Sequence, residues 1–247
     1  MIPRGAIGGR LRLQYASSAV AVIPHGNSLT LGASAPAGFD YPSQLAGIPP
    51  LAGTGITPVN CGHSGWNWAQ LNGSSGGSTA DVDAATASAV AAGKKVVVIG
   101  WEGTNDFGSS GYSPTGARDR ATTWATMRRA AGATHIILLT CGPSWQSTNT
   151  QTVNNNFNNT ALAYNALLRS GYRTMGADVL VDVAAPGSVF GDLLAGGDFS
   201  QSAFAATSSS GLWNATEVAS AKWLHYSSAG YLYIAGLVGA GLRRVPR

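Results

Sequence analysis

The chain has 247 residues, enough to bury the core of one sizeable α/β domain or of two small ones. Only 11% of the residues are charged, well below the usual quarter, and Gly, Ser, Thr and Asn supply much of the polarity. The net charge of +4 comes from scattered Lys and Arg, and no apolar run reaches the roughly 18 residues of a membrane-spanning helix. These features argue against a nucleic-acid partner and against a membrane span.

The chain begins with a segment, residues 1–18, that we expect to be an N-terminal arm or an extra strand. A single domain is expected over residues 19–247. Only the short apolar block AVAVIP (19–24) follows the arginines of the first segment, and it is too short for the apolar part of a signal peptide. We therefore expect no signal peptide, which leaves the compartment open between the cytoplasm and a phage virion.

Five short apolar runs rich in β-branched residues recur along the chain. They are near-continuous rather than alternating, as expected of parallel strands that are buried on both faces. The expected strands are residues 19–24, 55–60, 95–100, 134–140 and 178–183.

The segments between these runs carry helix signals, with Ser or Thr at the start, Gly at the end, or both. The expected helices are residues 78–94, 115–132, 159–176 and 227–244. The Asn-rich piece 149–160 is expected to be a polar surface loop, and residues 184–224 a long loop region with room for a short helix. Strand and helix alternate along the chain, and this alternation predicts a doubly wound α/β fold.

Polar and glycine-rich segments follow the expected strands. They read HGNSLT, NCGHSGWNW, WEGTNDFG and CGPSW, and KWLHYSSAGYLYIA comes after the long loop region. In a parallel sheet ligands bind outside the carboxyl ends of the strands, so a serine, a glycine turn, an asparagine and a histidine fall on one rim. Acyl transfer needs a serine with a histidine base and preorganised donors for the oxyanion.

Four of these segments, GNSLT, NCGHSG, GTND and LHYSSAGYLYIA, resemble in order the motif blocks of the SGNH (GDSL-like) hydrolases, a family of serine esterases and lipases. The resemblance covers roughly residues 19–240. It implies a three-layer αβα sandwich on a five-stranded parallel sheet, flavodoxin-like, with strand order 2-1-3-4-5 and no metal or organic cofactor. It also implies Ser28 as nucleophile, His225 as base, and an oxyanion hole made by Ser28, Gly65 and Asn105.

Two positions depart from the family pattern. Asn27 stands in place of the usual aspartate of the first block, and Lys222 stands where the family has its acid, three residues before His225. Two alternatives follow: a Ser–His dyad steered by a backbone carbonyl, or an acid from elsewhere in the chain. The candidates for that acid are Asp182, Asp198 and Glu217. The side chain of Lys222 is expected to point to solvent.

Other residues near the motif blocks have more than one interpretation. Glu102, before the third block, is either a buried structural carboxylate or a substrate contact, and Asp106 is expected to cap backbone N–H groups. Trp66, Trp101 and Trp145 are candidates for an aromatic wall against a sugar ring or an acyl chain, with loop packing as the alternative.

The two cysteines, Cys61 and Cys141, fit no zinc pattern. In the implied strand order they follow strands that are three spacings, about 14 Å, apart, so both are expected to be free.

The sequence therefore predicts a serine ester hydrolase without metal. Small carboxylic esters and O-acetyl groups on polysaccharide are the two substrate classes left open. The rival hypothesis is a catalytically weak or idle member that binds glycan as a phage or cell-surface component, and the missing acid is its main support.

Overall fold

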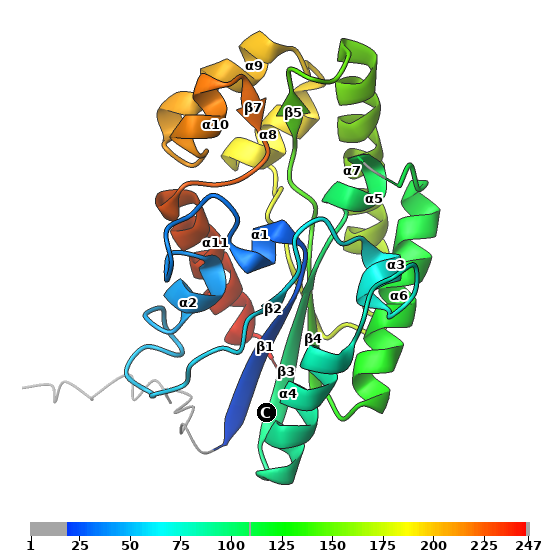
Figure 1. Cartoon of the computed structure of the whole chain (residues 1–247), viewed down its shortest axis with the longest axis vertical. Helices are drawn as coiled ribbons and strands as arrows, with labels where there is room; N and C mark the ends of the chain where they lie inside the picture. Colours follow the sequence, from blue (N-terminus) through cyan, green and yellow to red (C-terminus); the bar gives the residue numbers. More distant parts are fainter. Residues whose placement is uncertain (1–18, 109, 246–247) are drawn as a thin grey trace, which may run out of the picture.

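The computed structural model describes residues 19–108 and 110–245, and its centre is a parallel β-sheet (Figure 1). The arm or extra strand expected within residues 1–18 lies outside the described residues. The sheet has five strands in the order β2-β1-β3-β4-β6, which corresponds to the 2-1-3-4-5 order that the family resemblance implied. These strands are β1 (Val20–Gly26), β2 (Cys61–Gly62), β3 (Lys95–Trp101), β4 (His135–Leu139) and β6 (Val179–Val181).

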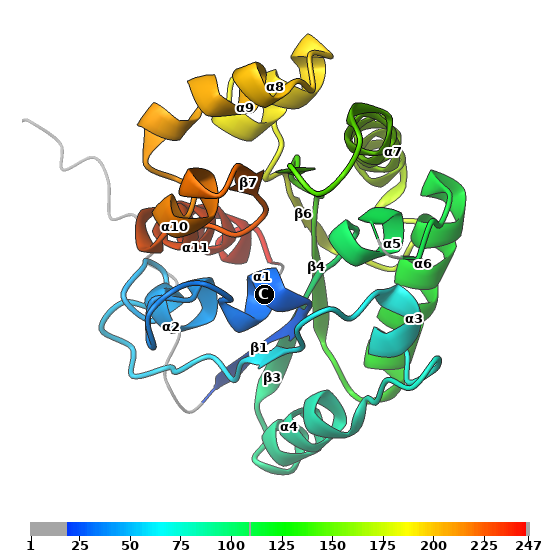
Figure 2. The same cartoon turned by 45° about the horizontal axis from the view of Figure 1, so that its top comes forward.

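Helices cover both faces of the sheet, which confirms the expected three-layer αβα architecture (Figure 2). Successive side chains of β3 alternate between two cores, with Val97 and Ile99 in one and Val96 and Val98 in the other. The first core is closed by α2 (Tyr41–Leu45) and α11 (Ser228–Leu242). The second is closed by α3 (Trp68–Leu71), α4 (Ala80–Ala91), α6 (Pro114–Ala130) and α7 (Gln151–Gly171).

The edge strand β2 is much shorter than expected. Residues 55–60 were predicted to be a strand, but the observed pairing begins at Cys61 and joins only two residue pairs of β1 and β2. Pro24 of β1 has no N–H to give to this neighbouring segment, and residues 55–60 share just one backbone hydrogen bond with β1, from Val59 N to Val22 O at 3.0 Å. The segment therefore runs beside β1 without forming a ladder.

The Asn-rich piece 149–160 was predicted to be a loop, and this prediction is wrong. Helix α7 already begins at Gln151, capped by the Thr150 side chain. The side chains of Asn154, Asn158 and Asn165 point from one buried helix face and bind the backbone of residues 141–146. Asparagine usually competes with the helix backbone, but here its amide is committed to a neighbouring segment.

Residues 184–224 contain more structure than the expected single short helix. They hold α8 (Val189–Gly196), α9 (Gln201–Ala206), the 3-10 turn η1 (Ser208–Ser210), α10 (Ala215–Ala219) and β7 (Lys222–Trp223). Strand β7 pairs antiparallel with β5 (Trp145–Gln146) and so ties this region to the segment after β4. The remaining short helices, α1 (Ser28–Leu31) and α5 (Thr104–Gly108), follow β1 and β3 directly.

Cys61 and Cys141 are both buried and free, which confirms the prediction for the thiols. None of the helices within the described residues is long and apolar enough to cross a membrane.

The buried asparagine face of α7 leads to a stability prediction. Asn158→Ala leaves the Ser144 N–H and carbonyl without their partners, and losing two buried hydrogen-bonding partners should lower the free energy of unfolding by about 2–4 kcal/mol. Asn159→Ala, on the exposed face of the same helix, is the matched control and should change it by less than about 0.5 kcal/mol. Urea unfolding of the two variants measures the difference, and equal losses would contradict the assignment.

Candidate active site

Ser28 follows the carboxyl end of strand β1, which lies between β2 and β3 in the sheet, and is the first residue of helix α1. Asn27 caps this helix, because its side-chain oxygen accepts a hydrogen bond from Leu29 N at 2.8 Å. The turn can pack this closely only through Gly26, where a Cβ atom would lie 2.4 Å from both Thr30 Oγ1 and the carbonyl oxygen of Trp101. The sequence thus folds into a tight strand–helix turn that fixes the backbone of Ser28.

His225 meets Ser28 from the segment between β7 and α11. Its Nε2 lies 3.1 Å from Ser28 Oγ, although the two residues are 197 positions apart in the chain. On the other side of the ring, Nδ1 lies 2.6 Å from Glu217 Oε1. The second oxygen of the same carboxylate accepts from the backbone N–H of His225 at 3.0 Å. One carboxylate therefore holds both the ring and the backbone of the histidine, and Ser28, His225 and Glu217 form a continuous hydrogen-bonded chain.

Glu217 is one of the three acids that the sequence left as candidates. It lies on helix α10, which Asn214 caps by accepting from Glu217 N at 3.1 Å, and Ser34 Oγ donates to its Oε1 at 2.9 Å. Burial raises the pKa of Glu217, but the hydrogen bonds and charge of His225 outweigh this and bring it to about 2. Glu217 is therefore ionised at neutral and mildly acidic pH.

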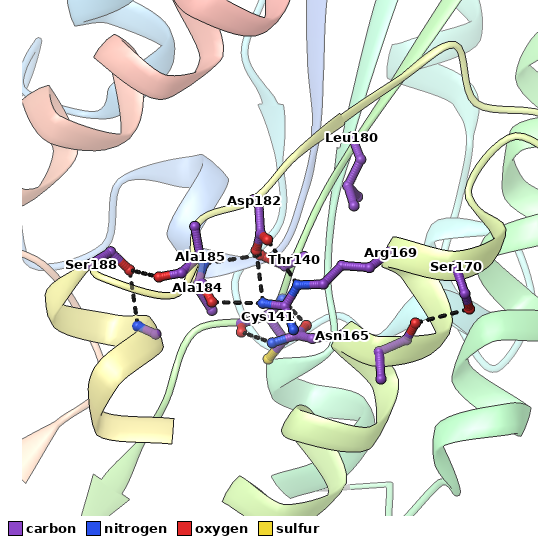
Figure 3. A network of polar contacts seen from close by, with 12 residues as sticks. Thr140, Cys141, Asn165, Arg169, Ser170, Leu180, Asp182, Ala184, Ala185 and Ser188 are labelled. Carbon is purple, nitrogen blue, oxygen red and sulfur yellow. Dashed lines mark hydrogen bonds and ion pairs between the residues drawn. The ribbon is translucent and has the colours of Figure 1, made fainter. Parts of the chain in front are cut away.

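The other two candidate acids have different partners. Asp182 accepts two hydrogen bonds from the guanidinium of Arg169, at 2.8 and 3.0 Å, and one from Thr140 Oγ1 at 3.0 Å, in the network of Figure 3. Asp198 is exposed and accepts from the backbone N–H of Ser200. Neither carboxylate has a hydrogen bond to His225, so the alternatives reduce to Glu217.

The expectation that Lys222 points to solvent is wrong. Its ammonium group lies 3.5 Å from Glu217 Oε1, and the side chain is only 34% exposed. The lysine pairs with the acid, and the same oxygen, Glu217 Oε1, contacts both the ammonium group and the ring nitrogen of His225. The position that holds the acid in the family pattern is occupied here by a cation on strand β7, which pairs with an acid on helix α10.

The two other expected oxyanion donors come from neighbouring loops. Gly65 follows β2 and has a φ angle of +79°, a backbone conformation that residues other than glycine rarely adopt. Asn105, in α5 just after β3, donates from Nδ2 to the carbonyl of Trp66 at 2.8 Å, which ties it to the residue next to Gly65. An amide nitrogen carries two hydrogens, so this bond leaves one for a ligand. Their role at an oxyanion stays a prediction.

The three tryptophans expected to form a substrate wall lie in different surroundings. Trp101 and Trp145 are only 1% and 6% exposed, because both pack in the first core, on the side of the sheet that α2 and α11 cover. Their proposed contact with substrate is therefore corrected to loop and core packing. Trp66 is half-buried beside Gly65, and its ring stacks on that of His63 at 3.7 Å between centroids.

One cluster within the described residues has the ligand types of a metal site. His25, His63 and Asp81 bring one ligand atom each within 4.8 Å of one another. However, the indole N–H of Trp124 donates to His25 Nδ1 at 2.9 Å, so the neutral imidazole carries its proton on Nε2. Burial lowers the pKa of His25 to about 3 and keeps it neutral. Neither ring nitrogen then offers a free lone pair, and the cluster does not fit a metal.

Comparison with known proteins identifies the family. Residues 25–232 match the model of the GDSL-like lipase/acylhydrolase family. The chain belongs to this family. Ester hydrolysis is the activity that the family implies, and the motif resemblance in the sequence is thereby confirmed. A search of curated proteins returned no match.

Several solved structures share the fold of this GDSL-like chain. A G-D-S-L family protein from Desulfitobacterium hafniense DCB-2 is 17% identical with a TM-score of 0.58, covering 91% of this chain and 99% of its own. A carbohydrate acetylesterase family member from Sinorhizobium meliloti is 14% identical with a TM-score of 0.58, and the match covers 91% of this chain and 95% of that one. A carbohydrate esterase of family 3 from Talaromyces cellulolyticus is 16% identical with a TM-score of 0.54, and the match covers 91% of this chain and 97% of that one. At these identities the likeness extends to the fold.

The contact of Glu217 with His225 leads to a kinetic prediction. Glu217→Gln keeps the shape of the side chain but removes the charge that faces the imidazole, and loss of such an acid in a serine protease costs on the order of 10⁴ in kcat. We expect a fall of about 10²–10⁴-fold in kcat for p-nitrophenyl acetate. Asp182→Asn, which removes the carboxylate bound by Arg169, is the matched control and should leave kcat within about twofold. A larger loss in Asp182→Asn than in Glu217→Gln would contradict the assignment.

Proposed function

We propose that this chain is a serine ester hydrolase that works through an acyl-enzyme. The observation that carries the proposal is the hydrogen-bonded chain from Ser28 through His225 to Glu217. Ser28 Oγ attacks the ester carbonyl while its proton passes to His225 Nε2, and Glu217 keeps the remaining ring proton on Nδ1 and stabilises the imidazolium. The leaving alcohol then takes the proton from Nε2. Water, activated by the same imidazole, attacks the acyl-enzyme and releases the acid.

The negative charge on the tetrahedral intermediate would be stabilised by three donors. We assign these to the backbone N–H groups of Ser28 and Gly65 and to the side-chain amide of Asn105. The bond from Asn105 to the Trp66 carbonyl supports this assignment, since it fixes the amide against the turn that holds Gly65. All three donors belong to segments that leave the same edge of the sheet.

The substrate class we propose is short acyl esters, with O-acetyl groups on glycans as the natural example. Trp66, half-buried beside Gly65, offers an aromatic face of the kind that sugar rings stack on. Two of the proteins with the same fold are described as a carbohydrate esterase of family 3 and a member of a carbohydrate acetylesterase family. The rival hypothesis of an idle glycan-binding protein rested on the lysine at position 222, and Glu217 beside His225 removes that support.

Hydrolysis of p-nitrophenyl acetate tests the catalytic assignment. Ser28→Ala and His225→Ala should each abolish turnover above background, and the double variant should be hardly worse, because residues that act as a unit show non-additive losses. Circular dichroism of each variant checks that the fold is intact. Turnover that persists in folded Ser28→Ala would exclude Ser28 as nucleophile, and an inactive wild-type protein would favour the rival hypothesis of an idle member.

The glycan assignment is tested separately by release of acetate from an O-acetylated polysaccharide. Trp66→Ala removes the stacking face, and aromatic contacts of about 0.5–1.5 kcal/mol correspond to about 2- to 13-fold in affinity. We expect KM for the polysaccharide to rise by up to about 10-fold, and by more than any change in kcat/KM for p-nitrophenyl acetate, which should stay within about threefold. Equal effects on both substrates would show that Trp66 acts on the site as a whole and not on a glycan.

A further inference from the structure

Glu102 is an almost fully buried carboxyl group, 1% exposed, immediately after β3. Its Oε1 accepts hydrogen bonds from the backbone N–H groups of Asn105 at 2.7 Å and of Asp106 at 3.1 Å. Its Oε2 accepts from the side-chain amide of Asn27. One side chain thus binds both the turn that carries Asn105 and the turn that carries Ser28.

Asn27 completes the link because its amide has two different ends. Its oxygen caps helix α1 by accepting from Leu29 N, and its nitrogen donates to Glu102. An aspartate here, as in the usual family block, could cap the helix but could not donate to a carboxyl group. The asparagine at position 27 and the glutamate at position 102 are therefore two halves of one interaction.

The acidic groups around this pair also favour an amide at position 27 while Glu102 is present. Asp106 is buried beside Glu102, and its Oδ2 accepts a hydrogen bond from Trp68 N at 3.1 Å. Burial, and then the charge of Asp106, raises the pKa of Glu102 well above its usual range. The site therefore disfavours further negative charge beside Glu102. An aspartate at position 27 would add a third carboxyl group to this site. The charge of Arg120 lowers the pKa of Asp106, but burial outweighs it and raises that pKa to about 6.

We propose that Glu102 and Asn27 form a positioning pair. The pair fixes the turn that carries Ser28, the nucleophile, relative to the turn that carries Asn105, the oxyanion donor. The pair touches no substrate and acts through Ser28 and Asn105. This proposal rests on the proposed esterase function. Because a small misplacement of reacting groups slows the chemical step far more than it weakens binding, the pair should control kcat rather than KM.

Exchanging the two side chains gives a sharp test. In Glu102→Gln the new amide nitrogen faces the amide nitrogen of Asn27, two donors without an acceptor, while in Asn27→Asp two carboxyl groups meet. In the double variant, the new amide nitrogen at position 102 can donate to the new carboxylate at position 27. The amide oxygen at position 102 can still accept from the backbone N–H groups of Asn105 and Asp106.

We expect each single variant to lose about 10²-fold in kcat for p-nitrophenyl acetate, with KM within about threefold. The double variant should recover at least about 10-fold over the poorer single variant, because the two residues are in direct contact and their effects should not simply add.

Melting temperature is measured on the same four proteins, since it separates positioning from stability. Recovery of the melting temperature without recovery of kcat would overturn the positioning role, and so would losses in kcat that simply multiply. If Glu102→Gln alone does not fold, the comparison of Asn27→Asp with the double variant decides. An inactive wild-type protein would overturn the esterase proposal and the positioning role with it, while the melting temperatures of the cycle would still report whether residues 27 and 102 interact.

Discussion

The common direction of the five strands determines where every group of this site can lie. Because all of them end at one edge of the sheet, the segments that follow β1, β2 and β3 meet there although they are distant in sequence. This constraint brings Ser28, Gly65 and Asn105 to the same edge, where contacts such as that of Asn105 with the carbonyl of Trp66 then link their segments. What remains for the rest of the structure is to fix the exact orientation of these groups and to supply a base and an acid.

Two glutamates, whose pKa values are shifted in opposite directions, orient these groups. Glu217 is held ionised because its oxygens receive hydrogen bonds from His225, Ser34 and the backbone, and a cation lies nearby. The pKa of Glu102 is raised because the side chain is buried and lies beside the carboxyl group of Asp106. Glu102 binds backbone N–H groups and the Asn27 amide. The same residue type thus has its pKa shifted in opposite directions at the two places, and its surroundings decide the direction.

Much of the fold follows directly from local sequence. Continuous apolar runs locate β1, β3, β4 and β6, and the motif blocks after them predicted the contact of Ser28 with His225 that the structure shows. The acid could not be chosen, because α10 is only five residues long and lacks a periodic pattern, and its Glu217 stands eight positions before the histidine and not three. The start of α7 was missed for a related reason: its buried face is made of asparagines, whose partners in residues 141–146 are visible only in three dimensions.

The place of Glu217 on α10 bears on how members of the family are classified. If an imidazole can receive its carboxylate from a separate short helix, the residue three positions before the histidine is free to change in evolution, even to the opposite charge, as at Lys222. A pattern search that demands D-x-x-H would then discard chains with an intact set of polar groups. The acid and the base can also be inherited, exchanged or engineered as independent pieces, since the only requirement on them is that they meet in space.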